Sequence, residues 1–261
     1  MRGPELRRNI KLVLEYDGAA FFGFQRQPRH ATVQETLENA LSRLFDQPLK
    51  IESASGRTDT GVHARAQTVN FRTSSPMACG AIRKALNGIL PPAIAVKEVR
   101  EAAQDFHARF GAAGKTYEYR IWNSPVRSPL RAAQSCHVMR KLDIAAMRRS
   151  AKVLKGRHDF RSLSAQDASR KGERNSVRTI RKLSVRREGS MVLIRVEADG
   201  FLYRMVRNIA GMLVEAGLGR ISPARTREIL QAKDRRLAPK TMPAQGLMLI
   251  SVKYPAVRLK R

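Results

Sequence analysis

The sequence predicts an α+β protein of two related subdomains, each a mostly antiparallel sheet with helices packed on it. Apolar residues recur with the period of strands in some segments and with the period of helices in others, and the two kinds of segment are intermixed. The order of elements also recurs loosely after about residue 104, without any repeat of the residues themselves. We therefore expect subdomains at residues 1–104 and 105–261, flanking a central basic cleft that takes a ligand.

The N-terminal half opens on a strand. Residues 10–16 alternate between apolar and other side chains, and the Asp17-Gly18 pair then supplies turn chemistry. Thr32 and Glu35 form a capping box ahead of an apolar stripe between residues 33 and 45, which predicts a helix. The same half is expected to contain strands near 50–54, 67–71 and 94–99 and a helix at 77–88.

The C-terminal half continues in the same mixed style. Periodicity predicts helices at 143–154, 204–217 and 223–232 and strands at 115–122, 179–187, 191–199 and 247–253. Residues 164–176 lack apolar periodicity inside a segment rich in Lys and Arg, which predicts a mobile basic loop. Two interpretations of this loop remain open, closure over RNA phosphates and a solvated insertion without a partner.

The charge of the chain predicts a polyanionic partner. The 261 residues include 50 Lys and Arg against 22 Asp and Glu, a formal net charge of +28, and the excess is spread along the chain. A nucleic acid is the expected partner because each neutralised phosphate releases counterions. The competing interpretation is a solvated basic surface with no partner.

Other classes are disfavoured by what the sequence lacks. No stretch approaches the roughly 20 apolar residues of a membrane span, and the N-terminal apolar run is too short for a signal peptide, so we expect a cytoplasmic protein with no membrane contact. Cys79 and Cys136 are far apart, and the five histidines are scattered. We therefore expect no disulfide framework and no metal site.

The segment at residues 56–63, with the sequence GRTDTGVH, is the strongest candidate for chemistry. It places Asp59 between Gly56 and Gly61, whose conformational freedom suits a tight loop. In so basic a chain we expect positive surroundings that keep Asp59 ionised and suit a polyanionic substrate.

The segment GRTDTGVHA at 56–64 resembles the signature of the TruA-type tRNA pseudouridine synthases. Other stretches follow in that family's order, so the resemblance spans nearly the whole chain: 16–18 with 24–27, 105–110, 115–119, 158–160, 205–209 and 244–247. It implies the pseudouridine synthase fold and the isomerisation of uridine to pseudouridine in the anticodon stem-loop of tRNA. It also implies that no cofactor or metal takes part and that the enzyme is a homodimer.

The resemblance also implies roles for individual residues. It makes Asp59 the catalytic carboxylate, places Tyr117 against the target base, and assigns Arg207 to the electrostatic support of Asp59. Arg57 is expected to hold a phosphate or help extrude the nucleotide, although a salt bridge that shapes the loop is an equal alternative. The remaining matches are given supporting roles around the cleft: His63, Phe106, His107 and Arg109.

Without the resemblance, two of these residues have ordinary interpretations. Helical periodicity puts Arg207 opposite the apolar stripe of its helix, where solvent exposure is the usual outcome. Tyr117 shares a strand face with Tyr119, and a core position suits either ring, with Tyr119 the better candidate for packing. Two alternatives to the enzyme are a tRNA-binding module or chaperone without turnover, and a synthase that acts on another RNA.

Overall fold

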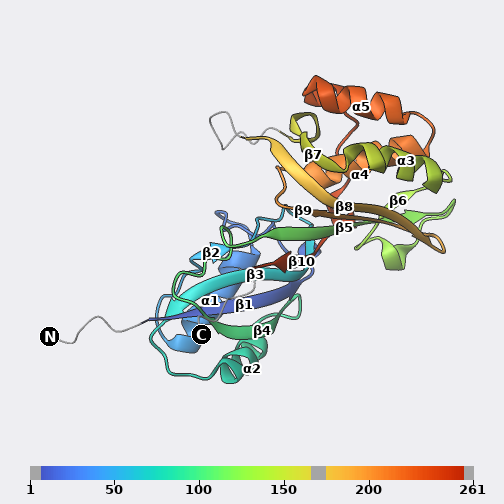
Figure 1. Cartoon of the computed structure of the whole chain (residues 1–261). Coiled ribbons are helices and arrows are strands. Elements are labelled where there is room, and N and C mark those ends of the chain that lie inside the picture. Colours follow the sequence, from blue (N-terminus) through green and yellow to red (C-terminus); the bar gives the residue numbers. More distant parts are fainter. Residues whose placement is uncertain (1–6, 166–174, 256–261) are drawn as a thin grey trace. The chain divides into compact units, whose positions relative to one another are not determined.

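The computed structural model describes residues 7–165 and 175–255 of the chain. These residues form helices and mostly antiparallel strands, as the α+β prediction requires. The chain divides into two compact units, residues 1–113 with 249–261 and residues 114–248 (Figure 1). The predicted basic loop lies mainly outside the described residues, at 166–174.

The first unit is built around the strand that opens the sequence. β1 (Arg8–Tyr16) pairs antiparallel with β3 (His63–Thr73) on one side and with β4 (Ile94–Ala102) on the other. The strand predicted near 50–54 is reduced to the two residues of β2 (Ser53–Ala54), which pair with β3. The short 3-10 helix η1 (Gly18–Ala20) follows β1, and β10 (Leu247–Lys253) ends in this unit.

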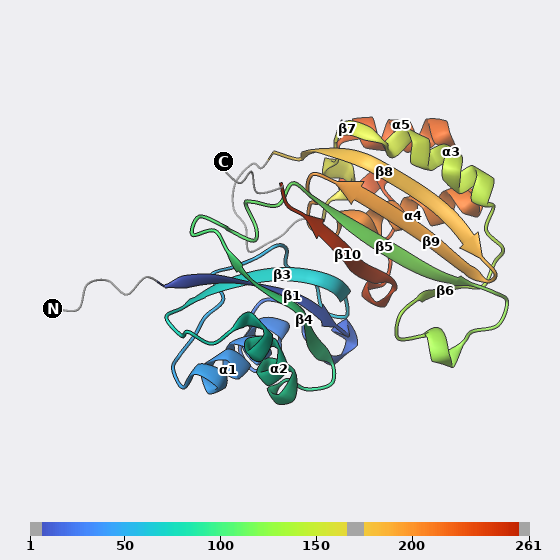
Figure 2. The same cartoon turned by 60° about the horizontal axis from the view of Figure 1, so that its bottom comes forward.

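One face of this sheet is apolar and is covered by α1 (Val33–Phe45) and α2 (Cys79–Ile89), which lie beneath it in Figure 2. The alternation in β1 points Ile10, Leu12 and Leu14 toward this face, and all three are fully buried. The N-cap half of the predicted capping box is present at the start of α1, where the Glu35 N–H donates to Thr32 Oγ1 at 3.3 Å, while the Glu35 carboxylate lies 3.4 Å from Arg26 Nη1.

The opposite face of the same sheet is polar, and the chain from residue 103 to residue 111 covers it. Asn9 Nδ2 donates to the carbonyls of Ala103 at 3.0 Å and Phe106 at 2.9 Å. Tyr254 donates its hydroxyl to the Ala108 carbonyl at 2.7 Å. These bonds explain why the first unit continues to residue 113, beyond the boundary expected after residue 104, and why the end of the chain returns to it.

The second unit has a sheet in the order β5, β9, β8, β7, with antiparallel neighbours. Its strands are β5 (Gly114–Asn123), β7 (Gly156–Asp159), β8 (Val177–Glu188) and β9 (Met191–Ala198), and β6 (Cys136–Val138) pairs parallel with the end of β5. The short 3-10 helices are η2 (Pro129–Arg131), η3 (Arg161–Leu163), η4 (Arg235–Leu237) and η5 (Ala244–Gly246). Periodicity does not predict β6 and β7, because segments of three and four residues are too short to show an alternating pattern.

Three helices pack in this unit: α3 (Ile144–Leu154), α4 (Met205–Gly217) and α5 (Pro223–Ala232). Of these, α4 is buried on nearly every side, and a Cβ added to Gly211 would lie 2.5 Å from the Lys240 carbonyl oxygen. The segment after η4 therefore presses against the face of α4 that its sequence pattern predicts to be in solvent.

Candidate functional site

Asp59 occupies the first position of a tight turn between β2 and β3. The Val62 N–H donates to the Asp59 carbonyl at 3.1 Å, which closes a four-residue β-turn. Gly61, the third residue of this turn, has φ of +79°, whereas Thr60 has a negative φ, so the turn is of type II. The glycine in the motif is therefore required by backbone geometry, as its sequence position predicts.

Two glycines from another part of the first unit press against this turn. A Cβ on Gly18 would lie 2.1 Å from the Val62 carbonyl oxygen. A Cβ on Gly23 would lie 3.0 Å from the Thr58 oxygen and 3.4 Å from the Asp59 carbonyl carbon, and Gly23 has φ of +85°. The backbone that carries Asp59 is thus packed directly against backbone on two sides.

Side chains fix the two ends of the turn. At its start, the Tyr16 hydroxyl and Thr58 Oγ1 are 2.8 Å apart in a buried hydrogen bond, and burial raises the pKa of Tyr16 well above its usual value. Gln67 Nε2 donates to the Gly56 carbonyl at 2.7 Å. Because Gly56 directly precedes Arg57, this bond also fixes the backbone from which the exposed Arg57 extends.

At the end of the turn, the His63 side chain is buried and contacts the residues that follow β1. The Gly18 N–H donates to His63 Nδ1 at 3.1 Å, and Asp17 Oδ1 lies 3.0 Å from the same nitrogen. Both contacts meet the ring at Nδ1, so the residues of the turn that ends β1 hold the ring in place. His63 therefore ties the turn that ends β1 to the beginning of β3, and the supporting role expected for it at the cleft stays a prediction.

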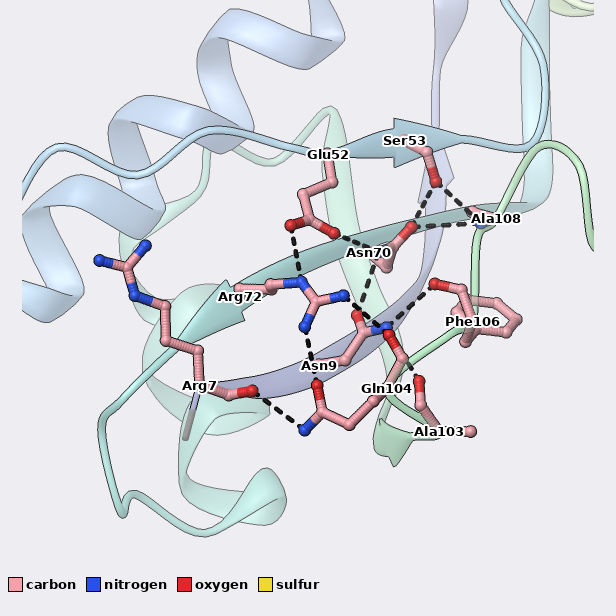
Figure 3. A network of polar contacts seen from close by, with 10 residues as sticks. All are labelled: Arg7, Asn9, Glu52, Ser53, Asn70, Arg72, Ala103, Gln104, Phe106 and Ala108. Carbon is pink, nitrogen blue, oxygen red and sulfur yellow. Dashed lines mark hydrogen bonds and ion pairs between the residues drawn. The ribbon is translucent and has the colours of Figure 1, made fainter. Parts of the chain in front are cut away.

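The other residues expected to support the site lie on the 103–111 segment, which a buried polar network attaches to the sheet (Figure 3). Asn70 is its centre: its amide nitrogen donates to Asn9 Oδ1 at 3.0 Å and to Glu52 Oε2 at 3.2 Å, and its amide oxygen accepts from Ser53 Oγ and from the Ala108 N–H. With these four bonds the buried amide is satisfied.

Within that segment each predicted residue has a local contact. Phe106 packs on the Tyr254 ring at 5.1 Å between centroids. His107 Nδ1 accepts from the backbone N–H groups of Arg109 and Phe110, at 3.2 and 3.1 Å, and so caps the turn. The Arg109 guanidinium lies 5.4 Å from the centre of the Phe110 ring.

These contacts do not place the segment beside Asp59. The segment is attached at Asn70, which lies seven residues along β3 from His63, or about 23 Å at roughly 3.3 Å per residue. In the first unit the structure therefore brings Arg57, Asp59 and His63 together, and leaves Phe106, His107 and Arg109 at another part of the sheet.

The second unit carries Tyr117 on β5. Its ring meets the edge of Phe201 at 5.0 Å between centroids and 86° between planes, and 8% of the residue is exposed. Tyr119, on the same strand face, is fully buried and donates its hydroxyl to the Pro243 carbonyl at 2.7 Å. The expectation that Tyr119 is the core residue of this pair agrees with its burial.

Arg207, also in the second unit, is held by the segment that covers α4. Its Nε donates to the Met242 carbonyl at 2.7 Å, and the Met242 N–H donates back to the Arg207 carbonyl at 3.3 Å. Arg207 is half-buried, so the solvent exposure expected from helical periodicity alone is wrong. The next residue, Pro243, accepts the hydrogen bond from the Tyr119 hydroxyl, so Met242 and Pro243 connect the Arg207 and Tyr119 side chains.

Sequence reasoning missed several residues that hold these groups in place. Asn70 and Pro243 carry no local pattern, because their partners are distant in the sequence. Gly18 had a usable signal, the Asp-Gly pair directly after a strand, which predicts a turn but not the close approach of Gly18 to the Val62 carbonyl.

No helix in the described part of the chain is long and apolar enough to cross a membrane. Among residues 7–165 and 175–255, no group of three or more His, Cys, Asp or Glu side chains is arranged to hold a metal ion.

Comparison with known proteins gives one consistent result. The family described as tRNA pseudouridine synthase matches residues 12–111 and 150–255. The tRNA pseudouridine synthase A of Pelobacter propionicus is 43% identical over 95% of this chain and 100% of its own length, and that of Acetivibrio thermocellus is 42% identical with the same coverage. The Chromobacterium violaceum enzyme of the same name is 42% identical over 94% of this chain and 93% of its own. The chain therefore belongs to the tRNA pseudouridine synthase family.

Proposed function

We propose that this chain isomerises uridine to pseudouridine in the anticodon stem-loop of tRNA, with Asp59 as the catalytic carboxylate and without a cofactor. The enzyme class follows from the family, which is defined by this isomerisation in tRNA. The net charge of +28 suits a tRNA substrate. We also propose that it works in the cytoplasm as a homodimer.

The reaction explains why a carboxylate is needed. The bond from ribose C1′ to uracil N1 must break, the released uracil must rotate, and C1′ must bond to C5, which then loses its hydrogen. A carboxylate serves this reaction either by attacking the base or by acting at the ribose. Both routes need an ionised oxygen held at a fixed place, and neither needs a second substrate.

The observation that carries this proposal is the fixed turn of Asp59. Its backbone is packed against Gly18 and Gly23, and hydrogen bonds hold both of its ends. A reacting group held in this way needs little reordering before reaction, which is one source of the rate advantage of an enzyme site over solution. A surface carboxylate that only improved solubility would not require such packing.

Tyr117 and Arg207 complete the proposal from the second unit. A flat aromatic ring stacks on a uracil, and a hydroxyl can meet its polar edge. A guanidinium favours the ionised form of a carboxylate. We propose Tyr117 as the partner of the base and Arg207 as the electrostatic support of Asp59, while Arg57 contacts phosphate or helps to extrude the nucleotide.

The decisive experiment is tritium release from unmodified tRNA labelled at uridine C5. Asp59→Ala, with a wild-type circular dichroism spectrum, is expected to release no tritium while binding tRNA almost normally, because phosphate contacts remain. Glu98→Ala is the matched control, since it removes a carboxylate of the same unit that pairs with Arg100 on the surface. A wild-type rate in Asp59→Ala would refute the catalytic assignment.

The same assay separates the alternatives. Tight binding of every cellular tRNA without release would favour a binding module or chaperone, and release from another RNA alone would favour a different substrate. The role of Arg207 is tested by Arg207→Lys, which is expected to lose most of its turnover because an ammonium cannot reproduce the planar pairing of a guanidinium with a carboxylate. Near-normal turnover in this variant would argue against the proposed support of Asp59.

A further inference from the structure

The loop between η1 and α1 presents a pair of stacked aromatic rings at the surface. Phe22 and His30 stack with 4.3 Å between ring centroids and 23° between planes. Phe22 remains 49% exposed, and His30 is exposed as well. Half of a large apolar side chain is therefore in water, although the neighbouring Phe21 and Phe24 are buried.

The two rings are held together by the backbone of the loop. The Phe22 N–H donates to the Ala31 carbonyl at 2.9 Å, and Gln27 Nε2 donates to the Phe22 carbonyl at 2.6 Å. Arg29 adopts a left-handed conformation with φ of 63°, which turns the chain back so that His30 reaches Phe22. The stacked arrangement is thus formed before any ligand arrives.

The loop is attached to the turn of Asp59. The Phe24 N–H donates to the Thr58 carbonyl at 3.0 Å, and a Cβ on Gly23 would lie 3.4 Å from the Asp59 carbonyl carbon. Because adjacent Cα atoms are about 3.8 Å apart, the Phe22 Cα lies within about 9 Å of that carbon. This distance is of the order of one nucleotide step along an unstacked RNA strand.

The chemistry of the loop fits RNA. Residues 25–31 contain two arginines and a histidine and no acid. Arg26 is partly committed to Glu38, at 3.0 Å, which leaves Arg29 as the more available cation. Exposed aromatic rings beside positive charge bind single-stranded nucleic acid by stacking on bases, whatever their sequence.

We propose that the Phe22–His30 pair is a stacking platform for an unpaired base of the RNA substrate, next to the uridine that reacts at Asp59. The proposal rests on RNA being the substrate and assigns the loop a role in substrate binding, not in the chemical step. A base removed from its neighbours when the target uridine is extruded loses stacking, and the platform replaces it.

The test measures RNA affinity as a function of salt. Phe22→Ala is expected to weaken tRNA binding and raise KM by about tenfold to a hundredfold, with kcat nearly unchanged. The dependence of log affinity on log salt keeps its slope, because no phosphate contact is lost. Phe22→Tyr retains wild-type affinity, whereas Phe22→Leu, which keeps an apolar side chain of similar size, behaves like Phe22→Ala.

Leu130→Ala is the control, because it removes a 97% exposed apolar side chain that carries no aromatic ring. Its affinity is expected to stay within about twofold of the wild type. A direct readout uses tRNA with 2-aminopurine at each nucleotide next to the target uridine. Wild-type protein quenches the fluorescence of one such base, and Phe22→Leu does not.

Two results would overturn the platform: wild-type affinity in both Phe22→Ala and Phe22→Leu, or quenching that persists without the aromatic ring. Neither depends on turnover, so they are distinguishable from failure of the proposed reaction. If instead the proposed reaction were wrong, the wild-type protein would bind tRNA and release no tritium.

Discussion

Gly18→Ala is the sharpest perturbation of the packing that holds Asp59. The added Cβ would lie 2.1 Å from the Val62 carbonyl oxygen and 2.3 Å from its carbon, whereas Cβ atoms essentially never approach other heavy atoms closer than 3.0 Å. The two backbones must therefore separate by about 1 Å. No side chain can move to absorb the change, because both atoms belong to the backbone.

Two quantities follow from this displacement. Forced overpacking of this kind lowers the free energy of unfolding by about 1 to 3 kcal/mol. Misplacing a reacting group by about 1 Å lowers its rate about a hundredfold, and Val62 closes the turn that Asp59 begins. We therefore expect Gly18→Ala to fold, to lose stability moderately, and to lose most of its turnover.

Urea unfolding followed by circular dichroism gives the stability, and single-turnover tritium release with excess enzyme gives the rate. Gly80→Ala is the control, since Gly80 lies in α2 with open space around it, and Ala there is expected to leave the rate unchanged and to stabilise the protein by up to about 1 kcal/mol. Wild-type turnover in Gly18→Ala would refute the link between this contact and the position of Asp59.

Three further outcomes are expected. Asn70→Leu removes the centre of the buried polar network and should lower the free energy of unfolding by about 3 kcal/mol, because partners lose their bonds in a dry site; denaturation in urea measures it. Burial alone would raise the pKa of Glu118, but the hydrogen bonds from Arg195 and Arg120 outweigh it and hold that pKa below its usual value. The ionised carboxylate therefore stabilises the fold above about pH 4.3, and this stabilisation is lost as the pH falls through the folded-state pKa. Glu118→Gln, which has no carboxylate to protonate, should lose less stability than the wild type between about pH 5 and 3. Equal shifts of the melting temperature in the two proteins over that range would contradict this. Tyr119→Phe leaves the Pro243 carbonyl without its donor and should lower the free energy of unfolding by about 1 kcal/mol. Because Pro243 follows Met242, which accepts from Arg207, the variant should also have a lower kcat at an unchanged KM. A raised KM with normal kcat would argue against this effect through Arg207.

Local sequence patterns predicted the elements that bury one apolar face. The alternation of residues 10–16 and the capped stripe of α1 were confirmed because strand and helix periods report directly which side chains face the core. The turn of Asp59 was predictable for a similar reason, since a glycine at its third position marks a positive φ.

Contacts between distant segments could not be predicted in this way. Periodicity shows that Arg207 faces away from the apolar stripe of α4, but not that residues 240–243 cover that side. Likewise, nothing local to Asn70 indicates that residues far along the chain will surround its amide. The family resemblance singled out Arg207 and Tyr117 as functional residues, but it did not supply the contacts that hold them.

The return of the chain end to the first unit has a consequence for biosynthesis. The Ala113 N–H donates to the Lys253 carbonyl at 2.8 Å, and Tyr254 bonds to Ala108 and packs on Phe106, so these contacts join residues more than 130 positions apart. Translation proceeds from the N-terminus, so a nascent chain makes the Asp59 turn early but acquires Lys253 and Tyr254, which complete the attachment of the 103–111 segment, only after the second unit has been translated. The second unit can finish folding while the first still lacks its last strand. A transcript that lacked the codons from Lys253 onward would therefore yield a protein with every predicted catalytic residue and an incomplete first unit.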